Sequence, residues 1–222
     1  MSTATSDPVA ARIRSAGLVP VIVIDDPERA ESLAEALTSG GLSCAEITFR
    51  TPRAIESLAR IAKRDPAFLL GAGTVVTVDQ ASRAHDAGAH FAVAPGLNAR
   101  VVEHCQHIGL PMYPGVATPS DIEAALALSL RVVKFFPAEP LGGLPYLNAI
   151  AAPYGEMAFM PTGGIIQDVL ARYLESPRVV ACGGSWIAPA DWIAAGDVAR
   201  ITKATAAAMN VVRQHRPAGV AA

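Results

Sequence analysis

The chain has 222 residues, 51% of them hydrophobic, and a formal net charge of −2 from 18 basic and 20 acidic residues. This length and composition suit a single globular core, and the balanced charge gives no support for a polyanionic partner. The aromatic residues, 5% of the chain, do not alternate with basic patches, so nucleic-acid binding is not predicted.

The N-terminal segment and the cysteines both favour a soluble cytoplasmic protein. Residues 1–8 show no basic segment leading into an apolar one, so we expect no secretory signal. No apolar run approaches the ~20 residues that a membrane span needs. The three cysteines, Cys44, Cys105 and Cys182, are far apart and match neither a complete disulfide framework nor a metal-binding spacing. We therefore expect no metal ion and no membrane association.

Strand-like and helix-like segments alternate along the chain. A short helix at 9–16 precedes an apolar run at 19–24, which is typical of a strand buried on both faces. Seven further strands are predicted at 43–49, 67–71, 91–94, 111–115, 131–136, 157–160 and 179–182. A helix is predicted between each pair of neighbouring strands. Thr51 with Pro52 and Thr118 with Pro119 mark the starts of two of these helices.

Eight strand–helix units without a linker or a composition break predict a parallel sheet in an α/β fold. We expect a TIM (β/α)8 barrel forming one domain over residues 1–222, preceded by the short N-terminal helix, with 1–8 and about 213–222 flexible. The alternative is an open doubly wound sheet, but the glycine-rich turn that such a sheet usually carries after its first strand is missing.

The strand predicted at 131–136 contains Lys134 among β-branched and aromatic residues. Pro137 has no N–H group and should end the strand. A buried ammonium group is costly unless it is paired or loses its proton, and the neutral amine is a nucleophile. Lys134 is therefore a candidate Schiff-base residue. A lysine that reaches the rim or pairs with a carboxylate explains this strand equally well.

The strand at 43–49 places a carboxylate in the same interior. The period of two in a strand puts Glu46, Thr48 and Arg50 on one side, which we expect to face the barrel interior or its mouth. The same period turns Lys134 inward. Glu46 and Lys134 are then a candidate acid/base and nucleophile. The alternative is a Glu46–Arg50 ion pair that serves only the structure.

Glycines follow the last two predicted strands. Gly163 and Gly164, and then Gly183, Gly184 and Ser185, expose backbone N–H groups where TIM barrels commonly hold phosphate. A tight turn that needs glycine explains either group alone. Both groups together, at these two strand ends, favour a phosphate site.

Thr74 and the histidines carry weaker signals. Thr74 ends the third predicted strand and can offer a hydroxyl group and a nearby N–H to a carboxylate or carbonyl oxygen, although a helix-capping threonine is the alternative. His104 and His107 lie three apart on a predicted helix, and a solvated helical face explains them better than a metal site.

In combination these segments resemble the KDPG/KHG aldolases, which are class I 2-dehydro-3-deoxy-phosphogluconate aldolases also active on 4-hydroxy-2-oxoglutarate. The resemblance extends from about residue 10 to about residue 212. Its motifs stand in family order at 46–50 (Glu-Ile-Thr-Phe-Arg), 71–75 (Gly-Ala-Gly-Thr-Val), 94–96 (Ala-Pro-Gly), 114–115 (Pro-Gly), 133–139 (Val-Lys-Phe-Phe-Pro-Ala-Glu), 161–165 (Pro-Thr-Gly-Gly-Ile) and 183–186 (Gly-Gly-Ser-Trp).

The resemblance implies a metal-free TIM barrel without a cofactor, usually a homotrimer, with Lys134 as the Schiff-base residue and Glu46 as the general acid/base. The remaining matched positions divide between two ends of the substrate. Those around the pyruvyl end are Arg50, Thr74, Pro95 and Phe136, and those at the phosphate end are Thr162, Gly163, Gly164, Gly184 and Ser185.

The activity implied by the resemblance is cleavage of 2-dehydro-3-deoxy-6-phosphogluconate to pyruvate and glyceraldehyde 3-phosphate, and of 4-hydroxy-2-oxoglutarate to pyruvate and glyoxylate. Thr162 and Ser185 resemble the gluconate branch of the family, and the alternative is a 2-dehydro-3-deoxy-6-phosphogalactonate aldolase. Two other classes share the fold: a metal-dependent aldolase or phosphosugar isomerase, and a non-catalytic sugar-phosphate-binding barrel. Lys134 and the lack of a histidine/carboxylate cluster oppose the first, and Lys134 with Glu46 opposes the second.

Overall fold

The structure, a computed structural model, describes residues 7–216, in which strands and helices alternate as predicted. The ends expected to be flexible, 1–8 and about 213–222, fall mostly outside the described residues. Within the described part, Pro8 begins helix α1 (Pro8–Ala16), and residues 213–215 belong to helix α10 (Val198–His215).

Nine parallel strands of the described residues form two sheets. The larger has the order β5-β4-β3-β2-β1-β9 and the smaller the order β6-β7-β8. Their bounds are β1 Leu18–Ile22, β2 Cys44–Thr48, β3 Leu69–Gly73, β4 Phe91–Val93, β5 Met112–Tyr113, β6 Gly115–Val116, β7 Val132–Phe135, β8 Ala158–Pro161 and β9 Cys182–Gly184. Strand β7 stops two residues before Pro137, in agreement with the missing N–H group of proline.

The edges of the two sheets approach each other at two places. On one side only Pro114 separates β5 from β6, because a proline cannot donate to the ladder, and its carbonyl accepts from the Lys134 N–H at 2.9 Å. The single strand predicted at 111–115 is thus divided. On the other side, two isolated parallel bridges, Phe159↔Val179 and Thr162↔Gly183, connect β8 with the segment that enters β9 and with β9 itself.

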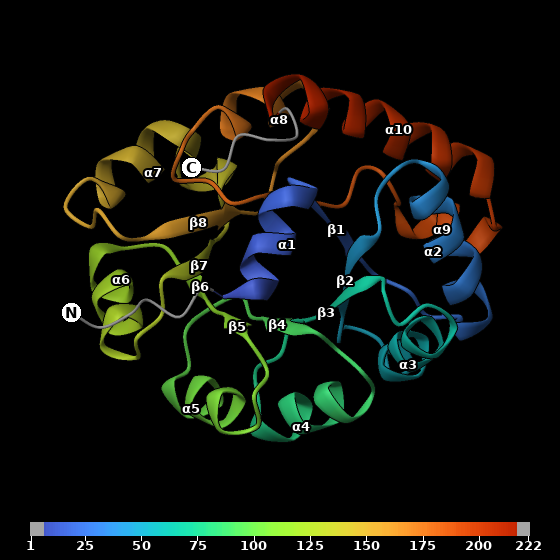
Figure 1. Cartoon of the computed structure of the whole chain (residues 1–222), viewed down its shortest axis with the longest axis horizontal. Helices are drawn as coiled ribbons and strands as arrows, with labels where there is room; N and C mark the ends of the chain where they lie inside the picture. The colour runs from blue at the N-terminus through green and yellow to red at the C-terminus, as the bar shows by residue number, and fades with distance from the viewer. Residues whose placement is uncertain (1–6, 217–222) are drawn as a thin grey trace.

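Helices surround the strands, as Figure 1 shows. They are α2 (Ala30–Ser39), α3 (Ala54–Arg64), α4 (Val78–Asp86), α5 (Ala99–His107), α6 (Pro119–Ala127), α7 (Gly143–Ala151), α8 (Gln167–Leu174), α9 (Ala190–Ala195) and α10, with short 3-10 turns η1 (Pro27–Arg29) and η2 (Glu139–Leu141). The Thr118 hydroxyl caps α6 as predicted. The predicted cap at Thr51 is wrong, since its hydroxyl donates to the Ile24 carbonyl and α3 has no side-chain cap. Among residues 7–216, no helix is long and apolar enough to cross a membrane.

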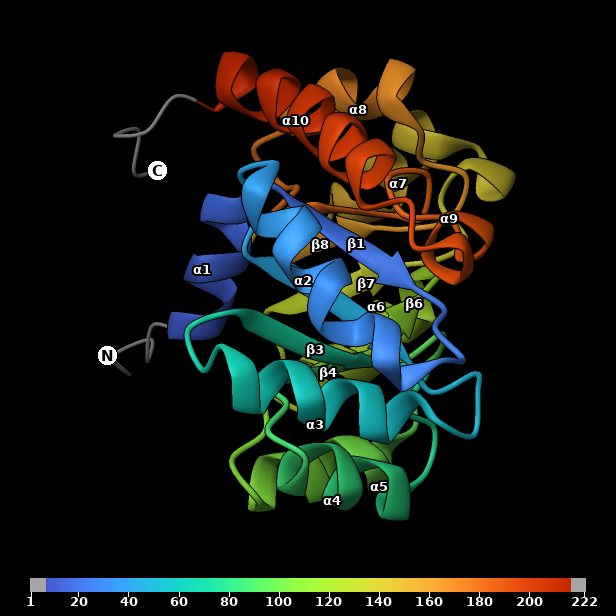
Figure 2. The ribbon, with the colours of Figure 1, turned by 90° about the vertical axis from the view of Figure 1, so that its right-hand side faces the viewer.

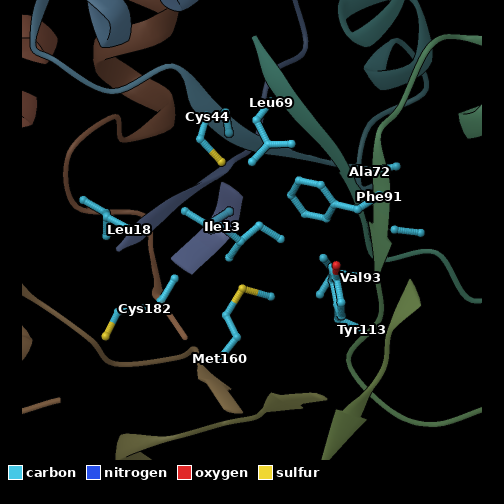
Figure 3. Close-up of a cluster of buried hydrophobic side chains, with 14 of the residues drawn as sticks. Ile13, Leu18, Cys44, Leu69, Ala72, Phe91, Val93, Tyr113, Met160 and Cys182 are labelled. Carbon is cyan, nitrogen blue, oxygen red and sulfur yellow. The ribbon is translucent and has the colours of Figure 1, made fainter. Parts of the chain in front are cut away.

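Helix α1 covers the end at which the strands begin (Figure 2). The Asp7 carboxylate caps α1 through the N–H groups of Val9 and Ala10, and its other oxygen accepts from the Tyr113 hydroxyl at 2.9 Å. Figure 3 shows Ile13 of this helix among the inward side chains of several strands. Apolar side chains of α1 pack against this end of the strands, and in α/β barrels the site lies at the opposite end, where the strands finish.

Candidate active site

The lysine and the carboxylate predicted to face one interior are in contact. Lys134 of β7 and Glu46 of β2 come from different sheets, and their side chains meet with Nζ 3.5 Å from Oε1. The two side chains are 5% and 2% exposed, respectively. Breaking a buried ion pair is strongly destabilising, so each charge depends on the other. Among the ion pairs of residues 7–216, Glu46 is paired with Lys134 and not with Arg50, so the Glu46–Arg50 ion pair weighed as an alternative is not formed. The other alternative, a lysine paired with a carboxylate, is the contact observed.

One oxygen of Glu46 remains available for a ligand. Oε2 is buried and has no hydrogen-bond partner within residues 7–216. A buried acceptor without a partner costs ~1–3 kcal/mol, which indicates a position where a ligand or a water molecule supplies the donor. A Cβ on Gly73 would lie 2.1 Å from Glu46 Oε1. Since Glu46 is in register with Gly71, this contact means that the carboxylate extends toward the carboxyl end of β3.

Lys134 lies between small and apolar neighbours. Its register partners are Gly115 of β6 and Met160 of β8, and Nζ lies 5.3 Å from the centroid of the Phe136 ring. A Cβ on Gly115 would be 2.0 Å from the Pro95 carbonyl oxygen, so the loop after β4 packs directly against the strand next to Lys134. Phe136 therefore lies beside the lysine, and Pro95 packs against the neighbouring strand at Gly115.

Arg50 and Thr74 lie together just beyond the ends of β2 and β3. Arg50 Nε is 3.4 Å from Thr74 Oγ1, and the arginine is exposed. Thr74 has a φ of 60°, a left-handed conformation that is uncommon for a residue other than glycine. Such conformations cost about 1–3 kcal/mol and often occur at functional sites. Thr74 does not cap a helix, because Thr77 caps α4, so the capping alternative is wrong.

The turn after β8 presents two backbone N–H groups. Gly163 and Gly164 have φ values of 98° and 80°. The carbonyls of Thr162 and Gly163 accept from the N–H groups of Ala138 and Glu139 at 2.8 and 3.0 Å. Because C=O and N–H point in opposite directions in a trans peptide, the N–H groups of Gly163 and Gly164 point away from η2. Neither donates a backbone hydrogen bond within residues 7–216, so both can receive an anion.

The turn after β9 lies beside the turn after β8. The Thr162↔Gly183 bridge joins the two segments one residue before each turn. Gly184 is buried at the end of β9, and Ser185, the next residue, is exposed. Thr162 is only 4% exposed and its hydroxyl donates to the Met160 carbonyl at 3.3 Å. Thr162 thus fills space under the two turns, whereas the Ser185 hydroxyl is accessible.

Sequence reasoning missed Gly73 and Gly115 as contributors to this site. Both act through the absence of a side chain against residues distant in the sequence, Glu46 and Pro95. It also missed Tyr173 of α8, which is fully buried and donates to Glu139. A large polar residue on the apolar face of a helix was the available signal for Tyr173.

The cysteines and histidines lie outside this site. Burial raises the pKa of Cys44 and of Cys182 to about 12 and that of Cys105 to about 11, which keeps all three thiols protonated. His104 Nε2 is 2.8 Å from Ser82 Oγ and joins α5 to α4, whereas His107 is exposed. No group of three histidine, cysteine or acidic residues within residues 7–216 could hold a metal ion.

A lysine amine buried next to a carboxylate at the ends of parallel strands is suited to form an imine with a carbonyl compound. This chemistry defines a class of enzymes that make and break bonds beside a carbonyl group. The chain belongs to the KDPG and KHG aldolase family, which it matches over residues 9–204.

Individual relatives agree with this membership. The chain is 49% identical to a 2-dehydro-3-deoxy-phosphogluconate aldolase of Treponema pallidum over 195 residues, covering 88% of this chain and 93% of that relative. A solved KDPG aldolase of Legionella pneumophila, with pyruvate captured as a covalent carbinolamine intermediate, has a TM-score of 0.87 and 39% identity over 90% of this chain and 97% of its own.

Two further solved structures are informative about the substrate. The 2-keto-3-deoxy-6-phosphogluconate aldolase of Zymomonas mobilis with 3-phosphoglycerate has a TM-score of 0.84 and 41% identity, covering 90% of this chain and 94% of its own. A native KDPGal structure has a TM-score of 0.81 but only 24% identity, covering 97% of this chain and 98% of its own, so it shares the fold alone.

Proposed function

We propose that this protein is a class I aldolase that cleaves 2-dehydro-3-deoxy-6-phosphogluconate to pyruvate and glyceraldehyde 3-phosphate through an imine on Lys134. The observation that carries the proposal is the buried contact between Lys134 Nζ and Glu46 Oε1, with Glu46 Oε2 left without a partner. Family membership supports the same activity, since the curated relatives are named as aldolases for this substrate.

The first steps use Lys134. Glu46 accepts a proton from the lysine, and the neutral amine attacks the C2 ketone of the substrate. Glu46 then returns its proton to the C2 hydroxyl of the carbinolamine, which leaves as water and gives an iminium ion, and the carboxylate is restored. The positive nitrogen of the iminium ion can take up an electron pair from the adjacent carbon chain. The covalent carbinolamine of the Legionella pneumophila relative is the species that precedes this iminium ion.

The carbon–carbon bond then breaks with help from a base. Glu46, directly or through a water molecule, removes the proton of the C4 hydroxyl group, and the electrons of the C3–C4 bond move to the iminium nitrogen. Glyceraldehyde 3-phosphate leaves, and C3 of the remaining enamine takes a proton. Water hydrolyses the resulting pyruvyl imine and restores Lys134.

The other matched residues hold the two ends of the substrate. Arg50 positions the pyruvyl carboxylate through charge-assisted hydrogen bonds, with the Thr74 hydroxyl beside it. Pro95 and Phe136 enclose the pyruvyl carbons. The two turns of Gly163–Gly164 and Gly184–Ser185 bind the phosphate, and Thr162 supports both from below. Two N–H groups without backbone acceptors support this assignment.

The same machinery accepts 4-hydroxy-2-oxoglutarate and yields pyruvate and glyoxylate. This compound keeps the C2 ketone and the C4 hydroxyl group on which Lys134 and Glu46 act, and it has a carboxylate in place of the phosphorylated tail. The match to a family of KDPG and KHG aldolases supports both activities.

The alternative substrate is the galactonate-derived epimer, which differs only in the direction of the C4 hydroxyl group. The low identity to the KDPGal structure gives it less support than the gluconate-derived compound receives from relatives at 41–49% identity. Rates of pyruvate release from the two purified epimers decide between them, and faster cleavage of the galactonate epimer would reverse the assignment.

We further propose that the two sheets close into one eight-stranded barrel within a single domain, with β5 and β6 acting as one strand. The Pro114 junction and the two bridges at β9 support closure.

We also propose a cytoplasmic homotrimer. Three free buried cysteines suit a reducing compartment, and the exposed Val76 and Val78 are candidates for a subunit contact. Sedimentation analysis of the wild type and of Val76→Asp tests the trimer.

Trapping of the imine tests the proposed activity. Incubation with pyruvate and borohydride should add one reduced pyruvyl group to the chain, which peptide mass spectrometry should place on Lys134, with or without a chelator. Lys134→Met, which keeps the length and apolar stem of the side chain, should take up none. An adduct at another lysine, or activity that a chelator abolishes and a metal ion restores, would contradict a class I mechanism at Lys134.

A further inference from the structure

A partly buried hydrogen bond connects helix α8 with the chain beside the Gly163–Gly164 turn. The Tyr173 hydroxyl donates to Glu139 Oε1 at 2.5 Å, and Arg172 Nη2 lies 3.6 Å from the same oxygen. Tyr173 is 0% exposed, whereas the Glu139 side chain is 30% exposed. Burial, followed by the bond to Glu139, raises the pKa of Tyr173 above its ordinary value, so the hydroxyl is a donor at neutral pH.

Glu139 is packed against the turn through both its backbone and its side chain. Its N–H donates to the Gly163 carbonyl at 3.0 Å. A Cβ on Gly164 would lie 2.7 Å from Glu139 Cβ, and a Cβ on Gly143 would lie 2.8 Å from Glu139 Oε1 and 3.2 Å from the Tyr173 hydroxyl oxygen. Glu139 is therefore enclosed between two glycines, and Tyr173 fixes the end of its side chain.

The bond also compensates a charge close to the turn. Glu139 is joined to this turn through the bond from its N–H to the Gly163 carbonyl, and a free carboxylate near an anion site weakens anion binding. Tyr173 and Arg172 both direct their donors at Oε1 and hold the carboxylate on the α8 side. A rigid turn also loses less entropy when it binds a ligand.

We propose that Tyr173 and Glu139 are positioning residues for the phosphate end of the substrate, which they serve by fixing the Gly163–Gly164 turn and by holding the Glu139 charge away from it. This inference rests on the proposed function only in naming a sugar phosphate as the substrate. The ligand group that it requires is a phosphate monoester dianion, for which inorganic phosphate is the simplest probe.

Tyr173→Phe tests the Tyr173–Glu139 hydrogen bond, which we call the brace, because the substitution removes one oxygen and keeps the ring in place. We expect the KM of the phosphorylated substrate and the Kd of inorganic phosphate, measured by titration calorimetry, to rise about 5-fold, the effect of one net hydrogen bond. The yield of borohydride-trapped pyruvate on Lys134 should stay within about 2-fold on the same scale, because pyruvate does not reach the turn.

Two controls separate positioning from general support of the fold. Tyr154→Phe removes another tyrosine–glutamate bond, the 2.9 Å contact with Glu123, and should leave KM and Kd unchanged. Glu139→Gln retains an acceptor for Tyr173 and should bind phosphate within about 2-fold of the wild type. Glu139→Ala removes the acceptor together with the charge, so its Kd should rise, though less than that of Tyr173→Phe, and it serves if that variant fails to fold.

Different outcomes would overturn the brace and the proposed substrate. Unchanged KM and Kd in Tyr173→Phe and Glu139→Ala would overturn the brace, and so would an equal fall in pyruvate trapping, since that indicates support of the whole fold. A wild type that binds phosphate but does not cleave the sugar phosphate would overturn the proposed substrate and leave the brace to be judged by the phosphate titration alone. A wild type without phosphate binding would overturn the brace.

Discussion

Gly73 and Glu46 are in closer contact than any side chain on Gly73 would permit. A Cβ at this position would lie 2.1 Å from Glu46 Oε1 and 2.6 Å from Glu46 Cγ. The two residues are on neighbouring strands, and the glycine on β3 provides the volume into which the carboxylate extends before it reaches Lys134. The position of the proposed base is therefore determined by a residue that has no side chain.

Gly73→Ala should consequently disturb the pair without touching either partner. We expect kcat to fall by at least about 10-fold, because an error of about 1 Å in a catalytic group can cost 10²-fold. Gly155→Ala is the matched control, since nothing lies within 4 Å of a Cβ at Gly155 and its φ is not positive. Steady-state kinetics and thermal unfolding of both variants check the effect. Full activity in Gly73→Ala would show that Glu46 relaxes without consequence.

Glu46→Gln tests the proton-transfer role. The amide keeps the shape of the side chain but cannot take a proton from C4–OH, so cleavage should slow by about 10²–10⁴-fold, the usual contribution of a positioned acid/base. Trapping of pyruvate on Lys134 should remain detectable. Single-turnover cleavage and borohydride trapping are measured in parallel, and thermal unfolding shows whether the loss of the buried pair has also unfolded the protein. Cleavage near the wild-type rate would remove Glu46 from the mechanism.

The sequence predicted that Lys134 and Glu46 face one interior because strand parity is a local property, whereas their direct contact is seen only in the structure. Apolar runs identified β2 and β7 to within one or two residues, and the period of two then turned both side chains inward. Strand parity does not determine the direction of the Arg50 side chain in the same way, because Arg50 lies past the end of β2. Its side chain is exposed and contacts Thr74. Parity holds only as long as the strand continues.

Contacts between distant segments could not be predicted in this way. At Pro114 the chain changes its pairing partner from β4 to β7, which is a contact between distant segments, and the absence of a cap at Thr51 depends on the Ile24 carbonyl. The brace at Tyr173 joins α8 to η2, and nothing in the spacing of either segment indicates the other. Such features follow from the packed fold, which pattern reasoning does not supply.

The cysteines should make the protein less stable in alkali. Burial raises the pKa of Cys44, Cys105 and Cys182 to about 12, 11 and 12, above the ordinary 9.0, so the folded state holds these protons more tightly than the unfolded state. The stabilising contribution is fully present below pH 9 and is lost as the pH rises toward 12.

Urea unfolding between pH 8 and 11 measures this loss, and replacement of all three cysteines by alanine should flatten the profile. In the native protein at pH 8, iodoacetamide should label none of the three thiols, because only the thiolate reacts and access is closed. In urea it should label all of them. Rapid labelling of the native protein would contradict the burial on which both expectations depend.

Ser185→Ala tests the phosphate end from the side chain that is accessible there. Ser185 follows Gly184 at the end of β9, beside the Gly163–Gly164 turn, and it is exposed, so its hydroxyl can donate to a phosphate oxygen. A hydrogen bond to a charged group contributes ~1.5–3 kcal/mol, and we expect kcat/KM for the phosphorylated substrate to fall by at least about 10-fold. Cleavage of 4-hydroxy-2-oxoglutarate, which has no phosphate, should fall less. Because binding at a remote end of a substrate also positions the reacting carbons, kcat should decrease together with the affinity.

The control is Ser39→Ala, at an exposed serine at the end of α2, which should leave kcat/KM for both substrates unchanged. Equal losses on both substrates in Ser185→Ala would place Ser185 outside the phosphate site and leave the backbone N–H groups of the two glycine turns as its donors.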